Sequence, residues 1–134
     1  MDSHDKYHAW RKVIRSFSYA GQGIRQTWRS ELNFRIEIAI SILVIGMASF
    51  FGLALSEWAI LCLTISIVLA LELVNTALEA AVDLITDHRY APLAKVAKDA
   101  SAGAVFLASI MAVIIGCLIF IPYLWEWGRN WGTL

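Results

Sequence analysis

The sequence predicts an all-α integral membrane protein in which three transmembrane helices follow an N-terminal amphipathic surface helix. Of the 134 residues, 59% are hydrophobic and only 16% are charged, whereas soluble domains are about half apolar and about a quarter charged. Three apolar stretches, at 36–55, 58–85 and 102–124, reach the roughly 20 residues that a membrane helix needs. A chain of this length forms one domain at most, so we expect a single membrane domain over 1–134.

The segment 5–30 has a different pattern. Aromatic and aliphatic residues recur at roughly helical spacing, and basic residues such as Arg11 and Lys12 lie between them. This pattern predicts an amphipathic helix lying in the membrane surface, although Gly21 and Gly23 could divide it into two pieces. A solvated basic tail that only sets the topology is the alternative interpretation.

The basic residues are distributed unevenly, which predicts an orientation. The formal net charge is zero, so nothing suggests a nucleic acid as partner, yet seven of the eleven Lys and Arg lie before residue 36. The loop 86–101 carries Arg89, Lys95 and Lys98, whereas the connection near residues 56–57 carries none. Because Lys and Arg accumulate in cytoplasmic segments, we expect the N-terminus and the loop 86–101 in the cytoplasm and the C-terminus outside the plasma membrane.

The second apolar stretch carries a polar stripe in its second half. At about 100° per residue, Glu79 and Asp83 lie within about 20° of Glu72 on the helix surface, and Asn75 lies about 60° away. The stripe is about 16 Å long. Ionisable groups at membrane depth cost several kcal/mol each and persist where they face a protein interior or a wet cavity. The sequence therefore predicts a functional face on this helix.

Several roles are open to such a face. Asn75 and its neighbours could join subunits by interhelical hydrogen bonds, but three carboxylates repel one another unless a cation or a proton intervenes. They could hold a divalent cation, supply a general base or relay protons in a transporter. Lys98 and Asp99 lie nearby in sequence, and carboxylates for magnesium beside basic residues are typical of a nucleoside triphosphate site. Lys95 and Asp99, at i,i+4 spacing, could simply pair. There is no GxxxxGK[ST] loop, which excludes a Walker-type site.

The segment ELVNTALEAAVDL (72–84), followed by AKVAKDASAGAV (94–105), resembles the signature of the prokaryotic membrane diacylglycerol kinase family. The N-terminal segment SYAGQGIRQTWRSELNFRIE (18–37) is also similar to the family's surface helix and first-span entrance, so the resemblance covers nearly the whole chain. Within the family, DLITDHRYAPLAKVAKDASAGA (83–104) is similar to the Gram-positive branch, the undecaprenol kinases.

The resemblance implies an ATP- and Mg²⁺-dependent lipid kinase that phosphorylates undecaprenol to undecaprenyl phosphate at the cytoplasmic interface of a bacterial membrane. Diacylglycerol is the alternative substrate. It also implies a homotrimer with active sites between subunits. A small oligomeric membrane transporter or scaffold that uses the polar stripe as a relay or as an adhesive surface is the non-enzyme alternative.

The resemblance also assigns roles to single residues. Glu72 matches the general base that takes the proton from the lipid hydroxyl, and Glu31 and Glu79 match the carboxylates that hold the magnesium of ATP. The residues that match ATP-binding positions are Lys12, Tyr19, Glu31, Glu79, Arg89, Tyr90, Lys98 and Asp99. Asn75 and Asp83 match polar positions that support the site. The diacylglycerol kinase branch has Arg at position 12, so Lys12 keeps the cation but not bidentate phosphate binding.

Overall fold

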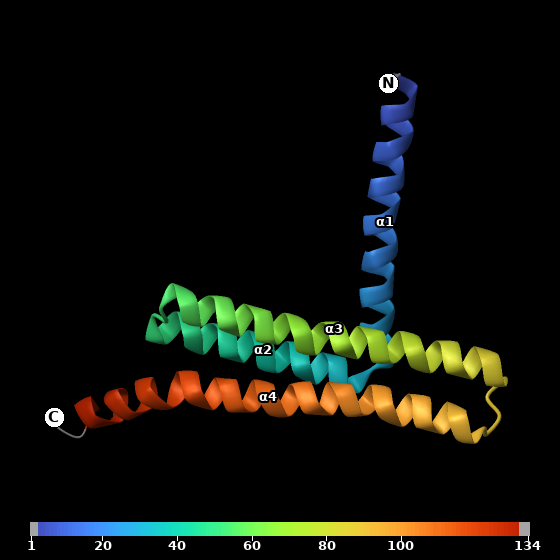
Figure 1. Cartoon of the computed structure of the whole chain (residues 1–134). Coiled ribbons are helices and arrows are strands. Elements are labelled where there is room, and N and C mark those ends of the chain that lie inside the picture. The colour runs from blue at the N-terminus through green and yellow to red at the C-terminus, as the bar shows by residue number, and fades with distance from the viewer. Residues whose placement is uncertain (1–2, 132–134) are drawn as a thin grey trace.

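Four helices make up the part of the chain that the structure, a computed structural model, describes: the backbone of residues 3–131 and the side chains of residues 10–130. They are α1 (Ser3–Ser30), α2 (Leu32–Phe51), α3 (Leu55–Thr86) and α4 (Pro92–Trp131). Helix α3 packs against both α2 and α4, and α1 projects away from these three helices (Figure 1). No strand occurs among the described residues, so the predicted all-α class is confirmed.

Helices α2, α3 and α4 are each long and apolar enough to cross a membrane. Large apolar side chains on their outer faces are exposed, among them Leu43, Leu63 and Leu118. In a bilayer these side chains would contact lipid tails, which are as apolar as leucine itself. The chain is therefore a multi-pass membrane protein. Helix α1 runs without a break through Gly21 and Gly23, so the two glycines do not divide it.

Helices α3 and α4 extend beyond the predicted spans 58–85 and 102–124 at both ends, whereas α2 begins before its predicted span 36–55 and ends at Phe51, four residues short of the predicted end. The loop expected over 86–101 is shorter, because α4 begins at Pro92 and only residues 87–91 are non-helical between α3 and α4. Proline is well tolerated at the first position of a helix, and the alanines and lysines that follow favour helix. An apolar stretch in the sequence shows which residues lie inside the membrane, but it does not show where a helix begins or ends. The first turns of α4 are polar, so they were predicted to be part of the loop.

The tight turn between α2 and α3 depends on Gly52. Its φ of 67° lies in the left-handed region, which glycine adopts without steric cost, and its N–H donates to the carbonyl of Ala48 at 3.1 Å. At this α2–α3 turn end, Glu57 accepts hydrogen bonds from the Ala54 N–H at 2.8 Å and from the Tyr123 hydroxyl at 2.7 Å. The start of α3 is thereby tied to α4. A cluster of buried apolar side chains lies at the same end and consists of Ala48, Leu53, Leu61, Ile119 and Phe120.

The opposite end of α3 is polar. Asp87 and His88 adopt positive φ values of 52° and 56°, and the His88 N–H donates to the Asp83 carbonyl at 3.1 Å. The chain thus reverses within a few residues and enters α4. This α3–α4 connection end carries the polar stripe that the sequence predicts.

Candidate active site

Glu72 is buried at the end of the polar stripe that lies farther from the α3–α4 connection. Its exposed fraction is 3%, and it is the one acidic residue among the described side chains that falls in the fully buried class. Its carboxylate lies within electrostatic range of those of Glu31, Glu37 and Glu79. The structure thus gathers the candidate base and both candidate metal ligands from α3 and from the joint between α1 and α2.

Glu31 occupies the joint between α1 and α2. It is the N-cap residue of α2, with an extended backbone (φ −103°, ψ 120°), and its N–H donates to the carbonyl of Thr27 at 2.8 Å. Thr27 is itself buried, with 4% exposed, because the end of α1 contacts both α2 and α3. The joint therefore fixes Glu31 beside the polar stripe.

A hydrogen-bonded chain links α4 to Glu79. The Ser101 hydroxyl donates to Asn75 Oδ1, and Asn75 Nδ2 donates to Glu79 Oε1 at 3.0 Å. Because Ser101 occupies the amide oxygen, the amide nitrogen of Asn75 is directed at Glu79. Asn75 therefore positions one oxygen of Glu79, and its supporting role in the reaction stays a prediction. Ser101 was not among the predicted site residues, and its partner on α3, 26 positions earlier, is not indicated by any local pattern.

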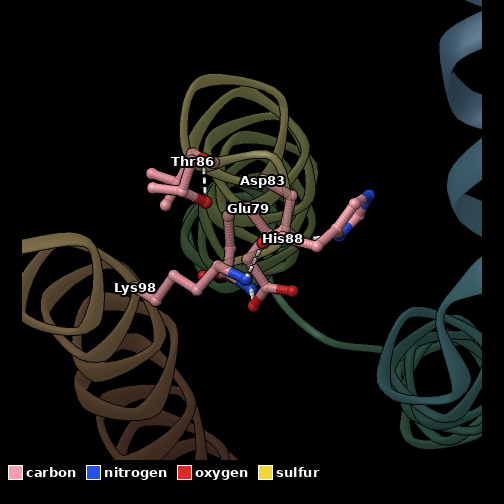
Figure 2. Close-up of polar contacts among 7 residues, drawn as sticks. Glu79, Asp83, Thr86, His88 and Lys98 are labelled. Atoms are coloured by element: carbon pink, nitrogen blue, oxygen red, sulfur yellow. Dashed lines mark hydrogen bonds and ion pairs between the residues drawn. The ribbon is translucent and has the colours of Figure 1, made fainter. Parts of the chain in front are cut away.

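An ion pair provides the second link between α3 and α4. Lys98 Nζ donates to Asp83 Oδ1 at 2.6 Å, and both side chains are about one-third exposed. Figure 2 shows Lys98 extending from α4 to Asp83 on α3, with Glu79 on the same side of α3. His88 Nδ1 lies 4.0 Å from the same Asp83 oxygen. The cation of Lys98 is thus held next to the carboxylate stripe.

A polar cavity of about 420 Å³ adjoins this ion pair. Its lining includes four of the predicted ATP-binding residues, together with Asp83, the ion-pair partner of Lys98. Those four residues are Arg89, Tyr90, Lys98 and Asp99. The predicted nucleotide contacts in the α3–α4 connection therefore share one hollow.

The structure does not bring every predicted ATP-binding residue to this cavity. Lys12 and Tyr19 are exposed on α1, and α1 projects away from the bundle (Figure 1). Asp99 forms an ion pair with Lys95 at i,i+4, as the spacing suggested, and both side chains are more than half exposed. The nucleotide residues thus fall into a group on the bundle and a group on α1.

Glu31 and Glu79 are the candidate ligands for magnesium. In the part of the chain that the structure describes, no group of three or more His, Cys, Asp or Glu side chains is arranged to hold a metal on its own. Mg²⁺ usually takes one or two protein carboxylates and completes its shell with phosphate oxygens and water. Glu31 and Glu79 offer two such oxygen donors close to Glu72. This donor set fits an ion that arrives with a nucleotide better than a permanently bound one.

Comparison with known sequences finds relatives among the prokaryotic lipid kinases. A family model described as prokaryotic diacylglycerol kinase matches residues 18–120. The chain is 45% identical to undecaprenol kinase from Bacillus subtilis over 124 residues, which is 92% of this chain and 100% of that protein. It is also 45% identical to diacylglycerol kinase from Synechocystis over 121 residues, which is 87% of this chain and 69% of that protein.

A more distant relative extends the same match. Diacylglycerol kinase from Escherichia coli K12 is 32% identical over 108 residues, covering 81% of this chain and 88% of that protein. The matched region of the family model includes the whole polar stripe, the α3–α4 connection and Ser101. The two relatives of equal identity are named for two different lipids, so identity alone does not select the substrate.

Proposed function

This chain belongs to the prokaryotic diacylglycerol kinase family and is a membrane lipid kinase, and from this premise we propose that it phosphorylates undecaprenol with ATP. The observation that carries the proposal is the buried Glu72, which lies among further carboxylates on the helix whose C-terminal end lines the polar cavity. A lipid alcohol and a phosphate donor have to meet where an apolar region and a polar hollow adjoin. The polar stripe of α3 lies between the apolar first half of this helix and the polar cavity at its end.

In the proposed reaction Glu72 accepts the proton of the lipid hydroxyl. The hydroxyl oxygen then forms a bond to the terminal phosphorus of ATP, the bond from that phosphorus to the bridging oxygen breaks, and ADP leaves. Such transfers depend on positioning and charge stabilisation more than on covalent chemistry of the protein. A carboxylate held in a buried position, as Glu72 is, suits the role of a general base.

The remaining side chains of the proposed site bind ATP and its magnesium ion. Glu31 and Glu79 would hold Mg²⁺, which neutralises charge on the phosphate oxygens when it is bound. Lys98 and Asp99 contact the nucleotide from α4, and Arg89 and Tyr90 contact it from the connection. Their shared cavity supports this grouping.

Lys12 and Tyr19 complete the nucleotide site only if α1 of one chain approaches the stripe of another, or if α1 moves. We favour the first arrangement, because α1 projects away from its own bundle (Figure 1). This geometry, together with the family resemblance, supports a homotrimer with shared sites. The uneven distribution of basic residues supports a cytoplasmic N-terminus and α3–α4 connection, with the C-terminus outside.

The choice of undecaprenol over diacylglycerol rests on two findings. The undecaprenol kinase of Bacillus subtilis is matched over its full length, whereas the Synechocystis diacylglycerol kinase is matched over 69%. The connection between α3 and α4 also resembles that of the Gram-positive branch. Diacylglycerol is the second candidate, because the Synechocystis relative is equally identical.

A lipid panel tests the proposal. Purified full-length protein in lipid nanodiscs is given Mg-ATP and either undecaprenol or diacylglycerol, and transfer of labelled phosphate to each lipid is measured. We expect faster phosphorylation of undecaprenol. A strong preference for diacylglycerol would reverse the order of the two substrates, and no transfer to either lipid would contradict the kinase assignment.

A further inference from the structure

Helix α1 carries a row of exposed apolar side chains along one face. At about 100° per residue, Trp10, Phe17 and Trp28 lie within about 20° of one another on the helix surface. Ile14 and Ile24 lie within about 40° of Trp10, one on each side. These five side chains are between 45% and 75% exposed. An exposed apolar row of this kind is typical of a helix that rests on a bilayer.

A second row, formed by Arg15, Arg25 and Arg29, borders the apolar row. Arg25, Arg29 and Arg15 lie about 60°, 100° and 140° from the middle of the apolar row, all on the same side. This arginine row extends over about 21 Å. The three side chains are exposed, and no acidic side chain in the described part of the chain forms an ion pair with them. Residues 10–30 contain no Asp or Glu, so α1 does not neutralise the row itself.

The arginine row faces away from the chain's own bundle. Thr27 is buried where the end of α1 contacts α2 and α3, and it lies about 160° from Arg29 around the helix. Lys12 and Tyr19, the predicted nucleotide residues of α1, lie at least about 160° from the middle of the apolar row. The arginines therefore lie between the apolar row and the side that carries Lys12 and Tyr19.

The direction of α1 places these rows relative to a bilayer. Helix α1 runs across the direction of α2, α3 and α4 and not along it (Figure 1). In a bilayer that these three helices cross, α1 therefore lies along the surface. With the apolar row against the lipid tails, the arginine row is at the level of the phosphate groups, which long basic side chains can also reach by bending.

We propose that the arginine row binds the phosphate groups of anionic phospholipids in the leaflet on which α1 lies. A guanidinium group can donate two parallel hydrogen bonds to one phosphate. Each basic residue near an anionic membrane surface strengthens binding by roughly fivefold. These phospholipids hold α1 in place and are not phosphorylated, so the inference goes beyond the proposed function and does not depend on which lipid is the substrate.

Limited digestion with trypsin measures how firmly α1 is held. Full-length protein is placed in nanodiscs of phosphatidylcholine, with or without phosphatidylglycerol, and the rate of cleavage after Lys12 is followed. Cleavage requires α1 to leave the surface and open locally, so its rate reports the population of the released helix. We expect cleavage at least about tenfold slower with phosphatidylglycerol, and high salt should reduce this difference. Cleavage after Arg89, in the non-helical residues 87–91, corrects for any change in trypsin activity.

Variants of the row test its part in this protection. Replacing Arg15, Arg25 and Arg29 together by Gln, which favours helix about as well as Arg, should bring the two rates to within about twofold of each other. Replacing all three by Lys keeps the charge but not the bidentate geometry, and should retain most of the difference. Arg129→Gln removes an exposed cation from the last turn of α4 and should leave the wild-type difference unchanged.

Three outcomes would overturn the inference. Equal cleavage of the wild-type protein after Lys12 in the two bilayers would show that the headgroup charge is not recognised. Equal protection in detergent micelles without phospholipid would assign the hold on α1 to contacts between copies of the chain. Equal protection by inorganic phosphate in phosphatidylcholine nanodiscs, at an ionic strength matched with chloride, would assign the row to soluble phosphate. The digestion requires no phosphate transfer, so a failed lipid panel and a failed headgroup site give distinguishable results.

Discussion

At the α2–α3 turn end, apolar side chains and one carboxylate join the helices, whereas at the α3–α4 connection end two polar pairs join them. The first end has the apolar cluster around Leu61 and Phe120 and the Glu57–Tyr123 hydrogen bond. The second has Asn75 with Ser101 and Asp83 with Lys98. Apolar contacts of the first kind suffice to pack membrane helices. The polar groups of the second end are expensive at membrane depth, which indicates that function rather than packing retains them.

The largest expected effect separates two carboxylates on α3. Glu72→Gln is expected to lower kcat by about 10²–10⁴-fold, because the amide cannot accept the hydroxyl proton, while ATP binding persists. Glu57→Gln removes a carboxylate from the same helix at the other end and should leave kcat within about twofold of wild type. Phosphate transfer and ATP binding are measured for both variants. Equal losses of kcat in Glu72→Gln and Glu57→Gln would show that the two ends of the bundle do not differ in their contribution to catalysis.

The ion pair between α3 and α4 gives the next effect. Lys98→Met is expected to raise the KM for ATP by roughly ten- to hundredfold, because a charge-assisted contact to phosphate is lost. Asp83→Asn keeps an acceptor for Lys98 and should raise the same KM by less. Steady-state kinetics with varied ATP measure both values. A larger effect of Asp83→Asn than of Lys98→Met would mean that the pair acts in folding and not in nucleotide binding.

The sequence predicts the bundle better than it predicts the site. Apolar length alone gives the three spans, and the spacing of Glu72, Glu79 and Asp83 gives the face that the site uses. The pairing of Asn75 with Ser101 depends on the register of α3 against α4, which no local pattern records. The amphipathic pattern predicts the helix α1 but not its direction, because the direction is set at the joint with α2 around Glu31.

A smaller effect is expected from the hydrogen-bonded chain that reaches Glu79. Ser101→Ala frees the amide of Asn75 to rotate, so Glu79 loses a fixed orientation, and the Mg²⁺ concentration for half-maximal activity should rise about tenfold. Ser101→Thr retains the hydroxyl and should preserve the wild-type value. Ser109→Ala is the matched control on α4, since Ser109 donates only to the carbonyl of Val105. Magnesium titrations at saturating ATP measure the three variants, and equal shifts for Ser101→Ala and Ser109→Ala would contradict an effect through Asn75.

The smallest expected effect lies at the α2–α3 turn end. Tyr123→Phe removes the hydroxyl that donates to Glu57 at 2.7 Å but keeps the ring contact with Phe51. Because the Ala54 N–H still donates to Glu57, the midpoint of thermal unfolding should fall only slightly, on the order of 2 °C, and kcat should not change. The double variant Glu57→Leu with Tyr123→Phe should lose less stability than the sum of the two single changes, since both remove the hydrogen bond between Tyr123 and Glu57. A loss of kinase activity in Tyr123→Phe would contradict the separate roles of the two ends, because it would show that the apolar end of the bundle also affects the reaction at the polar end.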